Sequence, residues 1–240
     1  MHKLIFLISL VSLVGCQPAE EAASDAVTEE AASTTDSTDP TVSEPNHYKV
    51  EFENDHVRVV RITYAAGEET QMHSHPASVS VFLTDAEGVL AMEDGSEVEF
   101  NNKAGDSMLM DAQSHQPRAK TDFELIQIEL KGGGGAEAAE EASGESLDAT
   151  VVEPEHYATV LENDDVRVLR ITYAADDESA LHSHPNAVLV SLTDGESELI
   201  LEDGTKREAN FKAGSAVWHP GETHHGKAHT ALDLILVELK

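Results

Sequence analysis

Apolar and polar residues alternate with a period of two along much of the chain. Residues 57–64 read Val-Arg-Val-Val-Arg-Ile-Thr-Tyr, and this pattern predicts a half-buried strand. Similar patterns predict strands at 79–83, 123–130, 166–173, 188–192 and 232–239. No stretch between them has a convincing helical period. The pattern therefore predicts an all-β protein built from short strands.

Turn signals separate the predicted strands. Asp94 is followed by Gly95, and the same dipeptide recurs at 203–204. An Asp-Gly pair between strand-like segments is a strong hairpin signal. Gly105 and Gly214 mark another turn. Many short strands at regular spacing indicate a β-sandwich or a small barrel.

The predicted strands occur in two copies. Residues 41–131 align with residues 150–240 without a gap when the chain is shifted by 109 positions, and about half of the aligned positions are identical. Each unit has 91 residues, which is enough to bury a core of its own. We therefore expect two similar domains, at 45–131 and 150–240, that fold largely independently.

The first fifteen residues have the character of a targeting segment. Lys3 precedes an apolar stretch at 4–14, which is too short to span a bilayer about 30 Å thick. The sequence Leu-Val-Gly-Cys then ends at Cys16, and residues 1–15 resemble a bacterial lipoprotein signal. This resemblance implies an acylated Cys16 that anchors the protein in the cell envelope. Because Gln17 follows, it also implies the outer membrane, on the periplasmic side. The alternative is an ordinary cleaved signal peptide with an incidental cysteine.

Two segments have the composition of flexible chain. Residues 16–44 are mostly Ala, Glu, Asp, Ser and Thr, which bury too little apolar surface to offset the entropy lost on ordering. We expect a disordered acidic tether there. Residues 132–149 begin with four glycines and continue with Ala and Glu, so we expect a flexible linker between the domains.

The charge of the chain limits its partners. The formal net charge is -31, and a protein this acidic repels the phosphates of nucleic acids. This charge excludes DNA and RNA binding and favours a heavily solvated surface. The single cysteine, Cys16, rules out a disulfide framework. A homo-oligomer is compatible with the sequence.

The histidines of the two repeats are the candidate metal ligands of this chain. Each repeat contains His-Ser-His-Pro, and alternate residues of a strand lie about 6 to 7 Å apart on the same face. His73 and His75 can therefore bind one ion, with His115 arriving on a neighbouring strand. The second repeat offers a corresponding triad at His182, His184 and His224.

The comparison between the repeats supports this reading. Between 106–118 and the matching 215–227, the histidine at 115 and 224 is the only identical position. Three neutral imidazoles suit a divalent Fe, Zn, Mn, Ni or Cu ion and leave coordination positions open. We therefore predict up to one metal ion in each domain.

These motifs resemble those of the cupin superfamily. Repeat 1 matches the two cupin motifs at Gly67, His73, His75, Gly105 and His115, and repeat 2 matches them at His182, His184, Gly214, Pro220 and His224. The resemblance covers both repeats almost end to end. The chain is also similar to the small stand-alone cupins known as β-alanine degradation proteins. The resemblance implies two jelly-roll barrels in tandem, each holding a divalent metal through its three histidines.

The sequence also departs from the cupin pattern. The glutamate of the first motif is absent, since Val79 or Ser80 stands there in repeat 1 and Val188 or Leu189 in repeat 2. The implied site therefore has three histidines and no carboxylate. This subset resembles thiol and diketone dioxygenases and also proteins with no known reaction.

A few neighbouring residues leave alternatives open. His225 adjoins His224 and is the alternative third ligand of repeat 2. His219 is either a surface residue or an additional ligand near the second site. Arg58 and Arg167 alternate with apolar residues, so we expect them on the outer face of their strands, unless one reaches a carboxylate.

Two classes of function fit the sequence. The first is a lipid-anchored metal-binding module that captures a small molecule, whose identity the sequence does not reveal, or the metal itself without turnover. The alternative is a metal-dependent oxidoreductase of the Fe(II) dioxygenase type that acts on a small molecule. Fold alone does not decide between them, because one fold hosts many chemistries.

Overall fold

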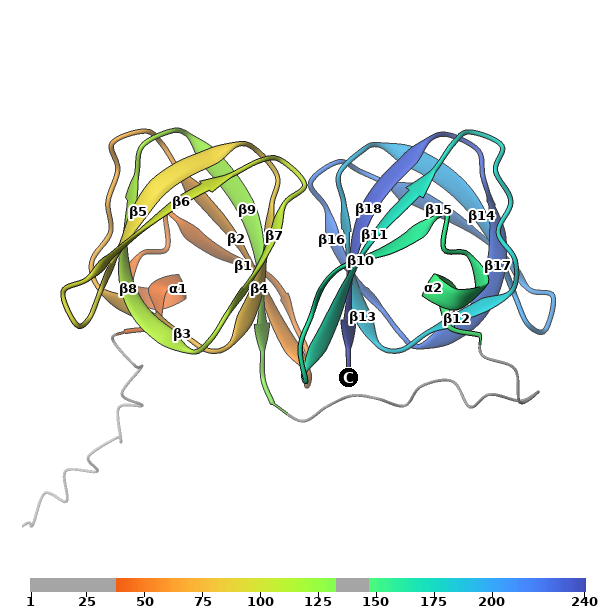
Figure 1. The fold of residues 1–240 in the computed structure, drawn as a ribbon, viewed down its shortest axis with the longest axis horizontal. Coiled ribbons are helices and arrows are strands. Elements are labelled where there is room, and N and C mark those ends of the chain that lie inside the picture. Colours follow the sequence, from red (N-terminus) through yellow and green to blue (C-terminus); the bar gives the residue numbers. More distant parts are fainter. Residues whose placement is uncertain (1–37, 133–146) are drawn as a thin grey trace, which may run out of the picture. The chain divides into compact units, whose positions relative to one another are not determined.

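The computed structural model describes residues 38–132 and 147–240, which form two β-barrels (Figure 1). We call residues 38–132 barrel 1 and residues 147–240 barrel 2. In each described range, one single-turn helix is followed by nine strands that form two antiparallel sheets. The predicted all-β class and the pair of jelly-roll barrels are confirmed.

Barrel 1 consists of a five-stranded sheet in the order β1-β2-β9-β4-β7 and a four-stranded sheet in the order β3-β8-β5-β6. Its strands are β1 (Tyr48–Glu53), β2 (Val57–Tyr64), β3 (His73–His75), β4 (Ser78–Phe82), β5 (Ala86–Met92), β6 (Glu97–Asn102), β7 (Ser107–Met110), β8 (Gln113–Ala119) and β9 (Phe123–Leu130).

Barrel 2 repeats this topology, with sheets in the order β10-β11-β18-β13-β16 and β12-β17-β14-β15. Its strands are β10 (Tyr157–Glu162), β11 (Val166–Tyr173), β12 (His182–His184), β13 (Ala187–Ser191), β14 (Gly195–Leu201), β15 (Lys206–Phe211), β16 (Ala216–His219), β17 (Glu222–Ala228) and β18 (Leu232–Leu239).

The predicted turns occur where the sequence places them. Gly95 connects β5 to β6 with a φ of 83°, a left-handed conformation that favours glycine. Asp94 stabilises this turn because its Oδ1 accepts a hydrogen bond from the backbone N–H of Ser96 at 2.9 Å. Gly105 has a φ of 87° in the turn between β6 and β7. Barrel 2 repeats both turns.

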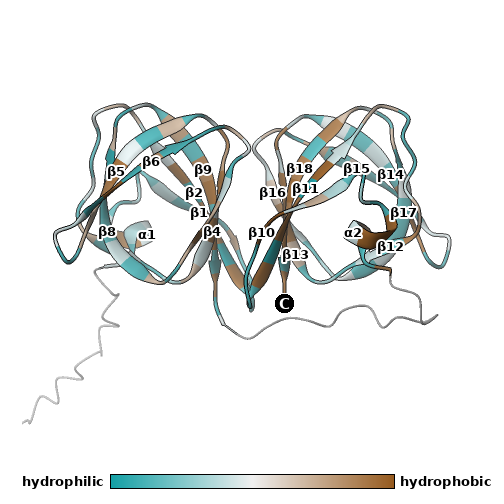
Figure 2. Cartoon of the chain, viewed as in Figure 1, coloured by the Kyte–Doolittle hydropathy of each residue, from teal (hydrophilic) through white to brown (hydrophobic). Residues whose placement is uncertain are grey.

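The central strands are more buried than the alternating pattern predicts. Val60, Ile62 and Tyr64 of β2 lie in the apolar core of barrel 1, as a half-buried strand requires. Val57 and Val59, on the opposite face, are also fully buried, in a second apolar cluster. Apolar residues concentrate in the sheets that contain β9 and β18 (Figure 2). Both faces of β2 are therefore buried.

The ordered chain begins earlier in each repeat than composition predicts. Helix α1 (Pro40–Ser43) lies in the segment that we expected to belong to the tether, and α2 (Ala149–Val152) begins at the last residue of the expected linker. Each begins after an aspartate that accepts a backbone N–H, Asp39 before α1 and Asp148 before α2. This capping, together with ion pairs described below, orders both segments. Composition alone does not reveal such contacts.

The remaining predicted segments lie outside the described residues. These are the signal segment with Cys16, the tether up to residue 37 and the linker from 133 to 146. Within the described ranges, neither helix has the length and apolar character needed to cross a membrane.

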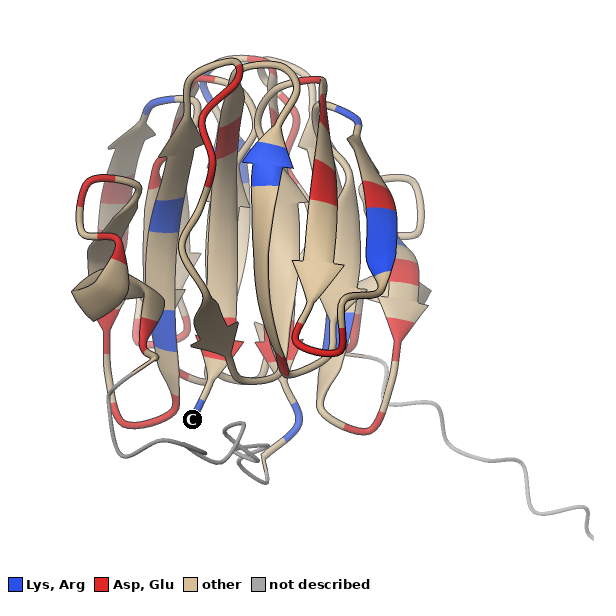
Figure 3. Cartoon of the chain, turned by 90° about the vertical axis from the view of Figure 1, so that its right-hand side faces the viewer, with Lys and Arg blue, Asp and Glu red and all other residues tan. Residues whose placement is uncertain are grey.

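Acidic residues gather on the loops and strand ends (Figure 3). Several of the few cations pair with them in exposed positions, as Lys103 does with Asp85 and Lys212 with Asp194, both at 2.7 Å. Exposed pairs of this kind contribute little to stability. The distribution agrees with the expected acidic, solvated surface.

Candidate metal centres

The structure brings the three predicted histidines of barrel 1 together. His73 and His75 occupy alternate positions of β3, and His115 lies directly opposite His73 on β8. All three side chains are buried, with relative exposures of 1%, 5% and 4%. One ligand atom from each lies within 4.8 Å of the other two. This spacing allows one ion to contact all three imidazoles.

Barrel 2 builds its triad in the same way. His182 and His184 occupy β12, and His224 lies opposite His182 on β17. Their ligand atoms also lie within 4.8 Å of one another, and all three residues are buried. The neighbouring His225 is not part of this group. It pairs with Ile200, whereas His224 pairs with Leu201, so the period of two directs these histidines to opposite faces.

A buried carboxylate supports each triad from outside. His75 Nδ1 lies 2.9 Å from Glu129 Oε1, and because a carboxylate accepts, Nδ1–H donates and Nε2 keeps its lone pair for a metal. Arg58 donates to the other oxygen of Glu129 at 2.5 Å and to Asp39 at 2.6 Å. A chain of contacts therefore runs from Asp39 through Arg58 and Glu129 to His75.

The same chain recurs in barrel 2. His184 Nδ1 lies 2.8 Å from Glu238 Oε1, and Arg167 donates to both Glu238 and Asp148 at 2.6 Å. The expectation that Arg58 and Arg167 lie on an outer face is therefore wrong. The alternative was that one of them reaches a carboxylate, and in the structure both do. The period of two instead directs Arg58 to the side of the sheet that faces the triad.

A tyrosine lies against the first histidine of each triad. His73 Nδ1 lies 2.8 Å from the carbonyl of Gln71, so this nitrogen donates. Nε2 is then an acceptor, and the Tyr48 hydroxyl donates to it at 3.0 Å. Tyr157 makes the same 3.0 Å contact with His182 Nε2 in barrel 2. A metal bound at Nε2 would replace this hydrogen bond.

Burial favours the neutral, ligating form of four of the triad histidines, namely His73, His115, His182 and His184. Burial, together with the nearby His75, lowers the pKa of His73 to about 4. Burial likewise lowers the pKa of His115 and of His182 to about 3. Although burial alone raises the pKa of Glu129, hydrogen bonds from His75 and Arg58 bring it below its usual value. Three imidazoles backed by one carboxylate are a donor set that suits a divalent transition metal.

The donor set fits a metal by a further criterion. His115 Nδ1 is buried and has no hydrogen-bond partner. Buried polar atoms in native proteins are nearly always satisfied, and a bound ion is one way to satisfy an imidazole nitrogen. The position of the glutamate in the first cupin motif is occupied by Val79 or Ser80 in barrel 1 and by Val188 or Leu189 in barrel 2. No carboxylate therefore joins either triad from this position. The triads therefore leave coordination positions open.

Barrel 2 contains a second group of possible ligands that shares His224. It consists of His219, Glu222 and His224, whose ligand atoms also lie within 4.8 Å of one another. Glu222 Oε1 lies 3.3 Å from His219 Nε2 and 3.2 Å from His224 Nδ1, and it accepts from Arg207 at 2.5 Å. Barrel 1 has Met110 and Gln113 at the positions of His219 and Glu222.

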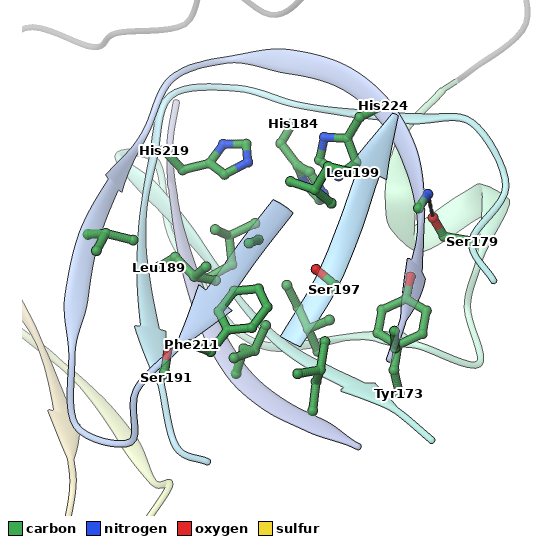
Figure 4. Close-up of a pocket in the computed structure, with 18 of the residues that line it drawn as sticks. Tyr173, Ser179, His184, Leu189, Ser191, Ser197, Leu199, Phe211, His219 and His224 are labelled. Atoms are coloured by element: carbon green, nitrogen blue, oxygen red, sulfur yellow. Dashed lines mark hydrogen bonds between the residues drawn. The ribbon is translucent and has the colours of Figure 1, made fainter. Parts of the chain in front are cut away.

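A cavity of about 250 Å³ lies beside the triad of barrel 2. His184, His219 and His224 stand at one end of it, and Leu189 and Phe211 lie further inside (Figure 4). The corresponding cavity of barrel 1 measures about 50 Å³. The two centres therefore have similar ligands but unequal space.

Sequence reasoning missed four residues of these centres, namely Glu129, Glu238, Tyr48 and Tyr157. Each lies far along the chain from the histidine that it contacts. The available signal was their identity between the repeats, since Glu129 corresponds to Glu238 and Tyr48 to Tyr157.

Solved structures with the same fold are cupin proteins. A cupin 2 conserved barrel domain protein from Leptotrichia buccalis is 16% identical with a TM-score of 0.50, and the match covers 80% of this chain and 88% of that chain. An oxalate decarboxylase from Bacillus subtilis with Mn(II) centres is 12% identical with a TM-score of 0.50, covering 76% and 68%. A salicylate 1,2-dioxygenase from Pseudoaminobacter salicylatoxidans is 11% identical with a TM-score of 0.50, covering 76% and 71%.

No protein-family model matches the chain, and no curated protein does so either. The structural similarity shows that the chain has the cupin fold, present in two copies.

Proposed function

We propose that the protein binds one divalent transition-metal ion in each barrel, through His73, His75 and His115 and through His182, His184 and His224. The observation that carries this proposal is the pair of buried triads, in which the second histidine is held by a carboxylate. Burial favours the neutral form of His73, His115, His182 and His184, and a neutral imidazole leaves the ion its full charge.

Each part of a centre has a separate task. The triad holds the ion, Glu129 and Glu238 orient one imidazole each, and the apolar surroundings exclude water. When bound, the ion supplies a Lewis acid with open positions for a small molecule. The ions that suit such a donor set are Fe, Zn, Mn, Ni and Cu.

Metal analysis of the full mature chain tests this proposal. We expect two ions per chain in the wild type, one in His73→Ala, one in His182→Ala and none in the double variant. Each ion should also raise the melting temperature, because a ligand that binds only the folded state stabilises it. Unchanged metal content in the double variant would rule out both triads.

A metal-dependent oxidoreductase of the Fe(II) dioxygenase type is the second candidate. It is favoured by the cavity beside the triad of barrel 2, which leaves room for a substrate next to open coordination positions. Mn(II) centres in an oxalate decarboxylase and a dioxygenase of salicylate occur on the same fold. Oxygen uptake by the Fe(II)-loaded chain with thiols, diketones and small acids tests this candidate, with His182→Ala as the control.

We also propose that Cys16 is acylated and anchors the protein in the outer membrane, facing the periplasm. The support is the apolar stretch of residues 4–14, which ends in Leu-Val-Gly-Cys. In a Cys16→Ser variant, we expect the protein to leave the detergent phase in a phase-partition experiment. Equal partitioning of the variant and the wild type would exclude the anchor.

A further inference from the structure

Because the two repeats align without a gap, each residue of one barrel can be compared with its counterpart 109 positions away in the other. Each residue that lines the small cavity of barrel 1 has its counterpart, 109 positions later, in the lining of the large cavity of barrel 2. Bulky side chains in barrel 1 are replaced by smaller ones in barrel 2. These pairs include Phe82 and Ser191, Phe100 and Ala209, Met108 and Val217, Pro117 and Gly226, and Phe123 and Leu232. Most changes in the lining therefore enlarge the space in barrel 2.

One pair of changes is coupled. Gly88 faces Phe100 across β5 and β6, and a Cβ on Gly88 would lie 2.4 Å from the Phe100 ring. Barrel 2 has Ser197 facing Ala209 at the same register. Glycine is thus required where the phenyl ring fills barrel 1, and it is not required where alanine leaves barrel 2 open. Phe211, in place of Asn102, is the main change in the opposite direction.

The enlarged cavity is mainly apolar. Leu189 and Leu236 stand where barrel 1 has Ser80 and Gln127. A dry apolar cavity of about 150 Å³ is large enough to hold benzene. The cavity of about 250 Å³ in barrel 2 therefore has room for a ring with substituents or for a short branched chain.

The polar end of the cavity differs between the barrels as well. His219 replaces Met110, and its Nδ1 is buried without a hydrogen-bond partner. Its Nε2 lies 3.3 Å from Glu222 Oε1, so the carboxylate favours a proton on Nε2 and leaves Nδ1 as an acceptor. An acceptor at the histidine end of an apolar cavity recognises a ligand that carries a hydroxyl group.

We propose that barrel 2, and not barrel 1, binds a compact, mainly hydrocarbon molecule with one hydroxyl group, which donates to His219 Nδ1. Barrel 1 then binds its metal only, because its own side chains occupy the corresponding space. This inference rests on the proposed function in one respect, namely that the ligand lies beside the metal centre of barrel 2.

Fluorine NMR on the zinc-loaded full chain tests this inference, with fluorobenzene and 4-fluorophenol as probes. The wild type is expected to bind both, and 4-fluorophenol more tightly. Ser197→Gly/Ala209→Phe introduces the pair that packs in barrel 1 and should weaken the binding of both probes at least about tenfold. Ser191→Phe, a second way to fill the cavity, should do the same. Met108→Val, a change in the cavity lining of barrel 1, should leave binding unchanged.

The variant His219→Met separates the hydroxyl from the hydrocarbon part. It should bind fluorobenzene as the wild type does and lose the preference for 4-fluorophenol. Absence of probe binding to the wild type, or equal binding by the filled variants, would overturn the inference. Equal affinity of the wild type for the two probes would overturn its hydroxyl part. Metal content is measured on the same samples, so that a chain that binds fluorobenzene but no metal would refute the proposed function alone.

Discussion

Glu129 and Glu238 link each triad to the rest of its barrel. Each carboxylate accepts from one ligating histidine and from one arginine, and each is almost fully buried. Such partners orient a ligand and raise its basicity. Glu129 and Glu238 therefore each fix the orientation of one imidazole.

Replacement of Glu129 by glutamine should therefore weaken the metal site of barrel 1. Glutamine keeps the shape of the side chain and loses its charge, so we expect metal affinity to fall by about 10- to 100-fold. Competition with a chelator measures the change in a His182→Ala background, where only barrel 1 binds. Glu99→Gln, at an exposed ion pair with Lys120, serves as the control. Equal affinity in the two variants would show that Glu129 does not support the ligand.

At the level of single residues, the sequence predicts the histidine triads but not the residues that contact them. His73 and His75 are visible because a strand has a period of two, and His115 because it alone survives in a diverged segment. Glu129 lies 54 residues from His75 in the chain and meets it only when the sheets close. Local periodicity does not contain such a contact.

Among the elements, β17 decides which histidine completes the second triad. His224 and His225 are adjacent, and the register with β14 directs them to opposite faces. Because β12 pairs with β17 at His182 and His224, only His224 lies beside both other ligands. The strand's period therefore discriminates between the two candidates that the sequence left open.

This register predicts different outcomes for two adjacent substitutions. His224→Ala should remove the metal of barrel 2, whereas His225→Ala should keep it, since its side chain faces away from the triad. Metal content per chain, measured in a His73→Ala background, gives the result. Loss of the ion in His225→Ala, with retention in His224→Ala, would reverse the assignment.

The long strands and the hairpins follow from the sequence more closely than the short helices do. The ranges 57–64, 123–130, 166–173 and 232–239 coincide with β2, β9, β11 and β18. The helices α1 and α2 escaped prediction because four residues are too few to show a helical period. They form instead through capping by Asp39 and Asp148 and through ion pairs with distant arginines.

For the whole molecule, the buried histidines couple stability to pH. In the unfolded chain they titrate near 6.5, whereas in the folded chain the pKa of His73 is about 4 and that of His115 and His182 about 3. As pH falls below 6.5, the unfolded state takes up protons that the folded state does not. Their contribution is thus fully present above this pH and is lost as pH falls toward 3 or 4.

The metal-free protein should therefore lose stability in acid more steeply than a variant without one of these histidines. Denaturant unfolding of the wild type and of His115→Gln, between about pH 7 and pH 4, measures the difference, because the carboxylates titrate in both. Since one unit of pKa shift corresponds to about 1.4 kcal/mol, we expect a difference of a few kcal/mol. Parallel curves for the two proteins would contradict the depressed pKa of His115.

Asp39 lies before the first strand of barrel 1, in a segment whose composition does not reveal that it supports the histidine triad. It caps α1 and, through Arg58 and Glu129, touches the group that holds His75. A barrel trimmed at residue 45 would leave Arg58 with one carboxylate partner in place of two. A division of this chain into its two barrels should therefore cut ahead of Asp39 and ahead of Asp148, because each of these residues lies before the first strand and still supports its histidine triad.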